Sequence, residues 1–217
     1  MEEKKIGLSN FWKSFYSYFT QKHILLIIAF ILLYRLGEAS LEKMIYPFML
    51  GGAESGGLGL SLEEYSFIKG TLATAALILG NIAGGVFLAK YGFKKCIWFF
   101  AAMLNLPSLL YVVMASVPLP VEVITLMLSF EQFGYGLGMM AFTVFVLEVS
   151  QRGNFPTSHY AISTGIMGLG MMVPAMVSGF LQLKMGYSAF FLFSCLLGVP
   201  SLLIIPFVLK ARKDWTG

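Results

Sequence analysis

The sequence contains few charged residues and few of the side chains that build metal or catalytic centres. Only 12% of its 217 residues are charged and 58% are hydrophobic, whereas soluble domains carry about 25% charged residues. This balance excludes a disordered chain and disfavours a soluble globular domain. The chain has two cysteines and two histidines, and it shows no metal-ligand spacing, no Ser/His/Asp set and no phosphate-binding loop. The sequence therefore predicts no cofactor, no metal and no enzyme active site.

Long apolar runs take up most of the chain. Six of them are long enough to cross a bilayer core about 30 Å thick at about 1.5 Å of helix per residue. Strand-like alternation of polar and apolar residues is missing, which disfavours a β-barrel. The predicted spans cover residues 24–50, 65–89, 96–117, 121–149, 160–183 and 187–209. We therefore predict an all-α integral membrane domain of six transmembrane helices.

The cations indicate how these spans are oriented, because cytoplasmic loops carry an excess of Lys and Arg. Six spans place both termini on one side, and with the termini in the cytoplasm eleven of the fifteen cations fall inside. The eleven are Lys4, Lys5, Lys13, Lys22, Lys90, Lys94, Lys95, Arg152, Lys210, Arg212 and Lys213. Lys43 and Lys69 sit near outer helix ends, where we expect them to snorkel. For Lys69, pairing with Glu63 or Glu64 is the other expectation.

This orientation divides the chain into three parts. Residues 1–22 are predicted to form a cytosolic amphipathic linker, because aromatic residues alternate with polar ones there. Residues 23–210 form the transmembrane domain, and residues 211–217 form a cytosolic tail. The predicted location is the plasma membrane.

Ionisable residues inside a span are costly and are candidates for function. Arg35, Glu38 and Glu42 follow one another three and four residues apart in the first span, so they share one helix face. Glu131 lies in the fourth span, about 15 Å from its outer end and close to the depth of Glu38. If these two helices are neighbours, we expect Arg35, Glu38 and Glu131 to meet near the bilayer midplane.

Two interpretations of these charges stay open. One is a static salt bridge, whose breakage costs about 3–5 kcal/mol but which has no further role. The other, which we favour, is a water-filled cavity in which Arg35 binds the substrate. Three acids against one deep base leave a surplus carboxylate, and in a low dielectric such a group carries a proton near neutral pH. Glu131 or Glu38 is the candidate for that role.

Small residues form the other recurring pattern inside the spans. Gly80 and Gly84 lie one turn apart in the second span, and Gly134, Gly136 and Gly138 follow Glu131 in the fourth. Such residues let helix backbones approach closely. Plain helix packing explains them, and transporters that rock between states need the same surfaces.

The loop after the second span reads GGVFLAKYGFKK and resembles the major facilitator signature G-x-x-x-D-R-x-G-R-K. Gly85, Lys90, Gly92, Lys94 and Lys95 match it in type or identity and are implied to form its gating loop. Ala89 stands at the Asp position, a departure that fits a C-terminal half of such a transporter.

Two further stretches resemble one branch of that superfamily, the AmpG-type muropeptide permeases. LLYRLGEA is similar to a YKLGDA-like segment of their seventh helix, and FEQFGYGLGMMAF to a FENLCGGMGTAAF-like segment of their tenth. The resemblance implies the C-terminal half of a major facilitator fold, with two inverted three-helix repeats. It also implies import of GlcNAc–anhydromuramyl peptides across a bacterial inner membrane, with protons, for cell-wall recycling. By resemblance, Arg35 takes the basic position, and Glu38 and Glu131 the acidic ones.

The overall prediction is part of a secondary active transporter that works by alternating access. A lone half would expose Arg35, Glu38 and Glu131 to lipid, so we expect a second six-helix half or a homodimer. The other predicted partners are the lipid bilayer and a small-molecule substrate, with no nucleic acid. Two alternatives are a non-transporting membrane sensor or assembly partner and, less favoured, a six-helix membrane enzyme.

Overall fold

The computed structural model describes residues 8–214. Within this range the regular elements are helices, and no strand occurs. Five segments are long and apolar enough to cross a membrane: Ile24–Leu50, Leu62–Tyr91, Phe93–Met114, Val121–Ser150 and Pro156–Lys213. The chain is therefore an all-α integral membrane protein. Lys4 and Lys5, with the outer parts of the predicted linker (residues 1–7) and tail (residues 215–217), lie outside the described residues.

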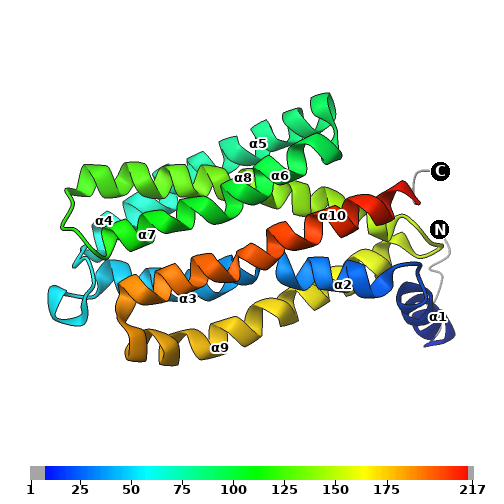
Figure 1. Ribbon diagram of the computed structural model, residues 1–217, viewed down its shortest axis with the longest axis horizontal. Coiled ribbons are helices and arrows are strands. Elements are labelled where there is room, and N and C mark those ends of the chain that lie inside the picture. Colours follow the sequence, from blue (N-terminus) through cyan, green and yellow to red (C-terminus); the bar gives the residue numbers. More distant parts are fainter. Residues whose placement is uncertain (1–7, 215–217) are drawn as a thin grey trace, which may run out of the picture.

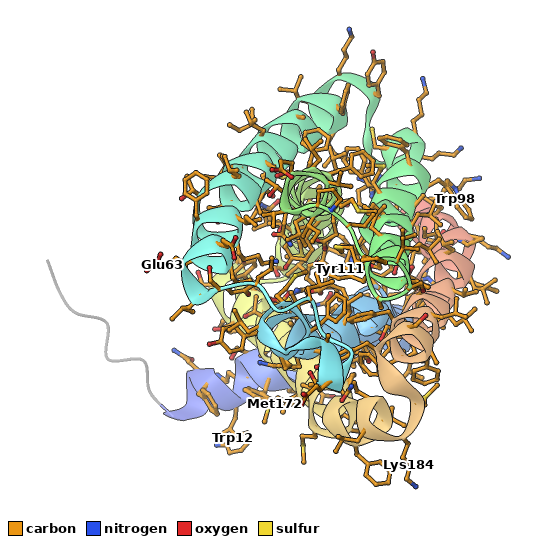
Figure 2. The ribbon with its side chains drawn as sticks, turned by 90° about the vertical axis from the view of Figure 1, so that its left-hand side faces the viewer. Trp12, Glu63, Trp98, Tyr111, Met172 and Lys184 are labelled. Atoms are coloured by element: carbon orange, nitrogen blue, oxygen red, sulfur yellow. The ribbon has the colours of Figure 1, made fainter. Side chains whose placement is uncertain are left out.

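Helix α1 (Leu8–Phe19) is amphipathic and packs across one end of the bundle. It buries Ser14 and Tyr18 and exposes Phe11, Trp12 and Tyr16. The Tyr18 hydroxyl lies 2.9 Å from the Ser163 hydroxyl of α9. In Figure 1, α1 and the end of α10 lie at the same end of the bundle, and in Figure 2 Trp12 points away from it.

The first three candidate spans are each interrupted. The segments are α2 (Ile24–Leu33) and α3 (Leu36–Leu50); α4 (Leu62–Phe67), the π-helical turn η2 (Ile68–Ala73) and α5 (Thr74–Tyr91); and α6 (Phe93–Asn105), the 3-10 turn η3 (Leu106–Ser108) and α7 (Leu109–Met114). Another 3-10 turn, η1 (Ala53–Ser55), lies in the loop before α4. Ser61 and Glu64 form a capping box that starts α4. Pro107 accounts for the third interruption, because proline cannot donate the helical hydrogen bond.

The last two candidate spans differ from each other. Helix α8 (Val121–Ser150) is continuous over 30 residues. Helix α9 (Pro156–Leu197) contains a non-helical residue, Gly186, with φ 75° and ψ 168°. The chain folds back near this residue and then enters α10 (Val199–Lys213). Gly186 has the positive φ that glycine adopts without strain.

Helix α8 packs against α5 and α6 at very short range. A Cβ atom on Gly136 would lie 2.5 Å from the Leu77 carbonyl oxygen of α5, and one on Gly80 would lie 2.2 Å from the Phe133 oxygen of α8. On the α6 side, a Cβ on Gly138 would lie 2.6 Å from the Leu104 Cβ. These glycines are therefore required for the observed helix separations. Helix α3 packs mainly on α9, which completes the bundle.

The buried core consists of two apolar clusters. One is centred on Phe30, Phe100 and Phe145, and the other on Phe48, Tyr111 and Phe191. Along the first span, Tyr34 is the last residue of the first cluster and Leu41 is the first residue of the second. A buried polar belt lies between them, at the level of the helix interruptions.

Candidate functional site

The polar belt is formed by residues from the first span and from α8. Arg35 and Glu38 lie between the two apolar clusters along the first span, and Glu131, Gln132 and Tyr135 do so along α8. The side chains of Arg35, Glu38 and Glu131 are each only 6% exposed. A buried charge needs a partner, so the contacts of each residue indicate what it is able to do.

Arg35 lies at the break between α2 and α3, where its backbone is not helical (φ −111°, ψ 10°). Its Nη2 is 2.8 Å from the Glu38 Oε2, and its Nε donates to the same oxygen at 2.9 Å. Nη2 also donates to the Tyr135 hydroxyl of α8 at 2.9 Å, and Nη1 lies 3.3 Å from the Met167 sulfur of α9. The guanidinium therefore connects three helices. Broken helices that present charged groups near mid-membrane are typical of transporter binding sites.

Glu38 lies in the first turn of α3, where the helix dipole favours a negative charge. Its Oε2 is occupied by Arg35, while Oε1 is buried and has no hydrogen-bond partner among the described residues. Glu42 lies one turn further along α3 and is exposed. With Lys43 it lines an open cavity of about 550 Å³, whose other walls are methionines and alanines of α3 and α9. The first-span charges thus run from the buried belt to this cavity.

Glu131 forms a second polar group with neutral neighbours. Its Oε2 accepts hydrogen bonds from the Tyr111 hydroxyl of α7 at 3.2 Å and from the Gln132 amide at 2.8 Å. Figure 2 shows Tyr111 pointing into the interior of the bundle, in contrast to Trp98 and Lys184 at its surface. None of the ion pairs formed within residues 8–214 includes Glu131. Its carboxylate therefore depends on dipoles and on more distant charges.

The loop that resembles the major facilitator signature is a very tight connection. Helix α5 ends at Tyr91 and α6 begins at Phe93, so Gly92 alone joins them, with φ 77°. Lys90 lies before it, and Lys94 and Lys95 follow in the first turn of α6. Lys94 shares a small cavity of about 150 Å³ with cations of α10. A gating role for Gly85, Lys90, Gly92, Lys94 and Lys95 stays a prediction.

Comparison with known proteins shows what the chain is similar to. No protein-family model matches it. It is 25% identical over 183 residues to a transporter named AmpG 1 of Rickettsia prowazekii, a match that covers 84% of this chain and 40% of that protein. It is 22% identical over 188 residues to an anhydromuropeptide permease of Escherichia coli K12, covering 87% and 37%. The chain is similar to the AmpG-type permeases.

The predicted resemblance to these permeases is thus confirmed over most of the chain. An uncharacterised protein of Haemophilus influenzae is 24% identical over 215 residues, which covers 94% of this chain and 49% of that protein. The chain spans about 40% of the length of the AmpG relatives that it matches. The Rickettsia and Escherichia proteins are named as a transporter and a permease.

The structure brings only some of the predicted site residues together. Arg35 and Glu38 form a direct pair, but Glu131 contacts Tyr111 and Gln132 instead of Arg35. Arg35 instead contacts Tyr135, which lies one turn along α8 from Glu131, so the three charges lie in one polar belt without a direct contact between Glu131 and the other two. The expectation that a lone half exposes these charges is wrong, since each is 6% exposed within this chain alone. The neighbouring helices already cover them.

Several residues of the polar belt were not predicted from the sequence. Tyr135 lies one helical turn after Glu131 and so places a polar side chain on the same helix face. That spacing could have identified it. Gln132 could have been identified as a polar residue within an apolar span. Tyr111 has no such signal in the sequence, because buried tyrosines are common. Lys69 was expected to snorkel, but its Nζ is buried and has no hydrogen-bond partner among the described residues. No group of three potential metal ligands was found among those residues.

Proposed function

We propose that the chain is the C-terminal half of a proton-coupled secondary transporter that moves an anionic or amphipathic solute, such as a muropeptide, into the cytoplasm. One observation supports this most strongly: Arg35 lies at a helix break inside the membrane and contacts three helices. A static salt bridge needs no broken helix. The similarity to anhydromuropeptide permease supports the solute class.

The proposed topology has six spans in two inverted three-helix repeats. The segment Pro156–Lys213 is 58 residues long, about twice what a single crossing needs. The non-helical Gly186 divides it, so we count it as two spans over residues 156–185 and 187–213. An even number of spans agrees with α1 and the end of α10 lying at one end of the bundle. With the cations as topology markers, that end is cytoplasmic, and the membrane is a bacterial inner membrane.

The proposed partner is a second six-helix half, with a homodimer as the other arrangement that completes the fold. The support is the coverage of the relatives, of whose length the chain spans about 40%. The shielding of Arg35, Glu38 and Glu131 gives no support, because this chain buries them by itself. Residues 1–22 are proposed to be the linker between the halves, and residues 211–217 the cytosolic tail.

The proposed cycle is alternating access. Arg35 binds an anionic group of the substrate after Glu38 has taken up a proton, because a neutral Glu38 no longer holds the guanidinium. Glu42 lines the open cavity that leads to this pair. Glu131 is the second carboxylate that takes up a proton on the outer side and releases it inside. Gly92 and the lysines around it form the loop that moves when the cytoplasmic side opens.

Uptake of tritiated GlcNAc–anhydromuramyl peptide tests this proposal. Cells should express the entire reading frame that encodes the chain, with wild-type, Arg35→Gln or Lys184→Gln sequence. We expect Arg35→Gln to abolish uptake and Lys184→Gln to retain it, since Lys184 is an exposed cation at the surface of the bundle and is the matched control. Wild-type uptake by Arg35→Gln would overturn the assignment. Binding of the peptide by the wild type without any uptake would favour the membrane sensor.

A further inference from the structure

Lys69 lies in η2, the π-helical turn that joins α4 to α5. Single π-helical turns inside α-helices are frequent at functional sites, where they rotate side chains away from the regular helical position. The Lys69 Nζ is buried and has no hydrogen-bond partner among the described residues. An ammonium group in that position is costly inside a membrane, so it is retained for a reason other than packing.

The turn that carries Lys69 packs against α8, the helix that carries Glu131. Burial disfavours the ionised form of the Glu131 carboxylate, and Lys69 is the cation that offsets part of this cost. The two groups do not form an ion pair within 4.0 Å in the described structure. They therefore interact across a gap.

The other groups around Glu131 supply no free positive charge for its carboxylate, so Lys69 takes that role. Glu42 of α3 is an acid and opposes the ionised form, while Tyr111 of α7 donates a neutral hydrogen bond. Tyr135 lies one turn along α8 and is hydrogen-bonded to Arg35. Arg35 itself is held by Glu38, at 2.8 Å. Among these groups Lys69 is the cation whose donors are all available.

We propose that Lys69 is a second anion-binding residue of the transporter and that its occupation makes Glu131 take up a proton. The inference rests on the proposed function and adds the link between substrate binding and proton uptake. Without substrate, the Lys69 ammonium balances the Glu131 carboxylate. When an anionic group of the substrate binds Lys69, the carboxylate is left without a counter-charge in apolar surroundings.

The charge balance of this step is simple. Glu131 takes one proton from a hydronium ion on the outer side: one O–H bond of the hydronium breaks and leaves water, and one O–H bond forms on the carboxylate. The proposed cycle also protonates Glu38 before Arg35 binds its anionic group, so the anionic groups at Arg35 and Lys69 enter together with two protons and the transfer carries no net charge. The substrate class is therefore a dianion, and its transport responds to a pH gradient rather than to membrane potential.

Labelling with dicyclohexylcarbodiimide tests the balance without any substrate, because this apolar reagent modifies carboxyl groups in their protonated form. Membranes that contain the entire protein are treated at neutral pH, and mass spectrometry follows labelling of Glu131. We expect Lys69→Met to raise the labelling rate about tenfold or more, because a buried charge is lost from beside the carboxylate. Lys69→Arg should keep the slow wild-type rate, which separates a charge effect from misfolding. Lys184→Met, which removes an exposed lysine at the surface of the bundle, is the matched control and should also label slowly.

Equal labelling of Glu131 in wild type and Lys69→Met would overturn the inference. In a wild-type protein that takes up tritiated GlcNAc–anhydromuramyl peptide, added peptide should raise the labelling rate toward that of Lys69→Met, and an unchanged rate would also overturn it. If labelling depends on Lys69 but the wild type takes up no peptide, the Lys69–Glu131 balance is supported and the proposed substrate is wrong. If the wild type takes up the peptide but Glu131 labels at the same rate in wild type and Lys69→Met, only the present inference fails and the proposed function stands.

Discussion

Neutralising Arg35 and Glu38 together separates a transport site from a static salt bridge. The Arg35→Gln variant leaves the Glu38 carboxylate without its ion-pair partner, although Glu38 is only 6% exposed. Removing one partner of a buried pair costs about 3–5 kcal/mol of stability. Removing both charges leaves two neutral amides of similar size, so we expect Arg35→Gln/Glu38→Gln to regain most of that loss.

The magnitude is large enough to measure by thermal unfolding of the purified protein in detergent. A loss of 1 kcal/mol lowers the melting temperature of a chain of this size by about 2–4 °C. We therefore expect Arg35→Gln alone to lower it by about 6–20 °C and the double variant to lower it by less than about 4 °C. Tyr135 contributes an additional hydrogen bond to Arg35 that neither variant preserves fully.

Uptake measured on the same variants decides between the two interpretations. If Arg35 binds the anionic substrate, the double variant is stable but transports nothing, because the cation is gone. A static salt bridge predicts that stability and uptake return together. A double variant that folds and transports like the wild type would therefore refute the reasoning.

Three further predictions follow from single features. Gly136→Val should destabilise the protein by about 1–3 kcal/mol in thermal unfolding, because its Cβ would lie 2.5 Å from an α5 carbonyl oxygen. Gly165→Ala should be neutral, because a Cβ there meets nothing within 4 Å. Equal effects of the two substitutions would contradict the packing account. Gly186→Ala should cost about 1 kcal/mol by the same measurement, since its φ of 75° disfavours a side chain; an unchanged melting temperature would contradict this. A hydrogen bond from Lys22 lowers the pKa of the exposed Asp214. This contact is therefore fully present above the unfolded carboxyl pKa of about 3.9 and is lost as pH falls through the lower folded pKa. Spin labels near both residues should separate only in acid, and separation at neutral pH would contradict the prediction.

The local parts of the structure followed from the sequence. The apolar runs predicted the spans, and Arg35 and Glu38 pair because residues three apart on one helix face are neighbours wherever the helix sits. The helix break beside Arg35 was not predicted, since no proline marks it. It coincides with Gly37, where a Cβ would lie 2.7 Å from the Ser194 carbonyl oxygen, so long-range packing accompanies the break.

The contacts between distant segments could not be predicted in the same way. Glu131 and Tyr135 lie one turn apart on the same face of α8. Which of them contacts Arg35 therefore depends on the position of α8 along its axis, which close contacts such as those of Gly80 and Gly138 constrain. The burial of Lys69 depends on the π-helical turn, which changes the face on which the side chain lies. These features come from packing between helices and have no local sequence pattern.

The central claim is that the buried polar belt couples solute entry to proton uptake. The most direct test is accumulation of tritiated GlcNAc–anhydromuramyl peptide driven by an imposed pH gradient, in cells that express the entire reading frame with wild-type or Glu131→Gln sequence. The account predicts that the wild type accumulates the peptide, while Glu131→Gln only exchanges it across the membrane without accumulation. Unchanged, pH-driven accumulation by Glu131→Gln would contradict the account.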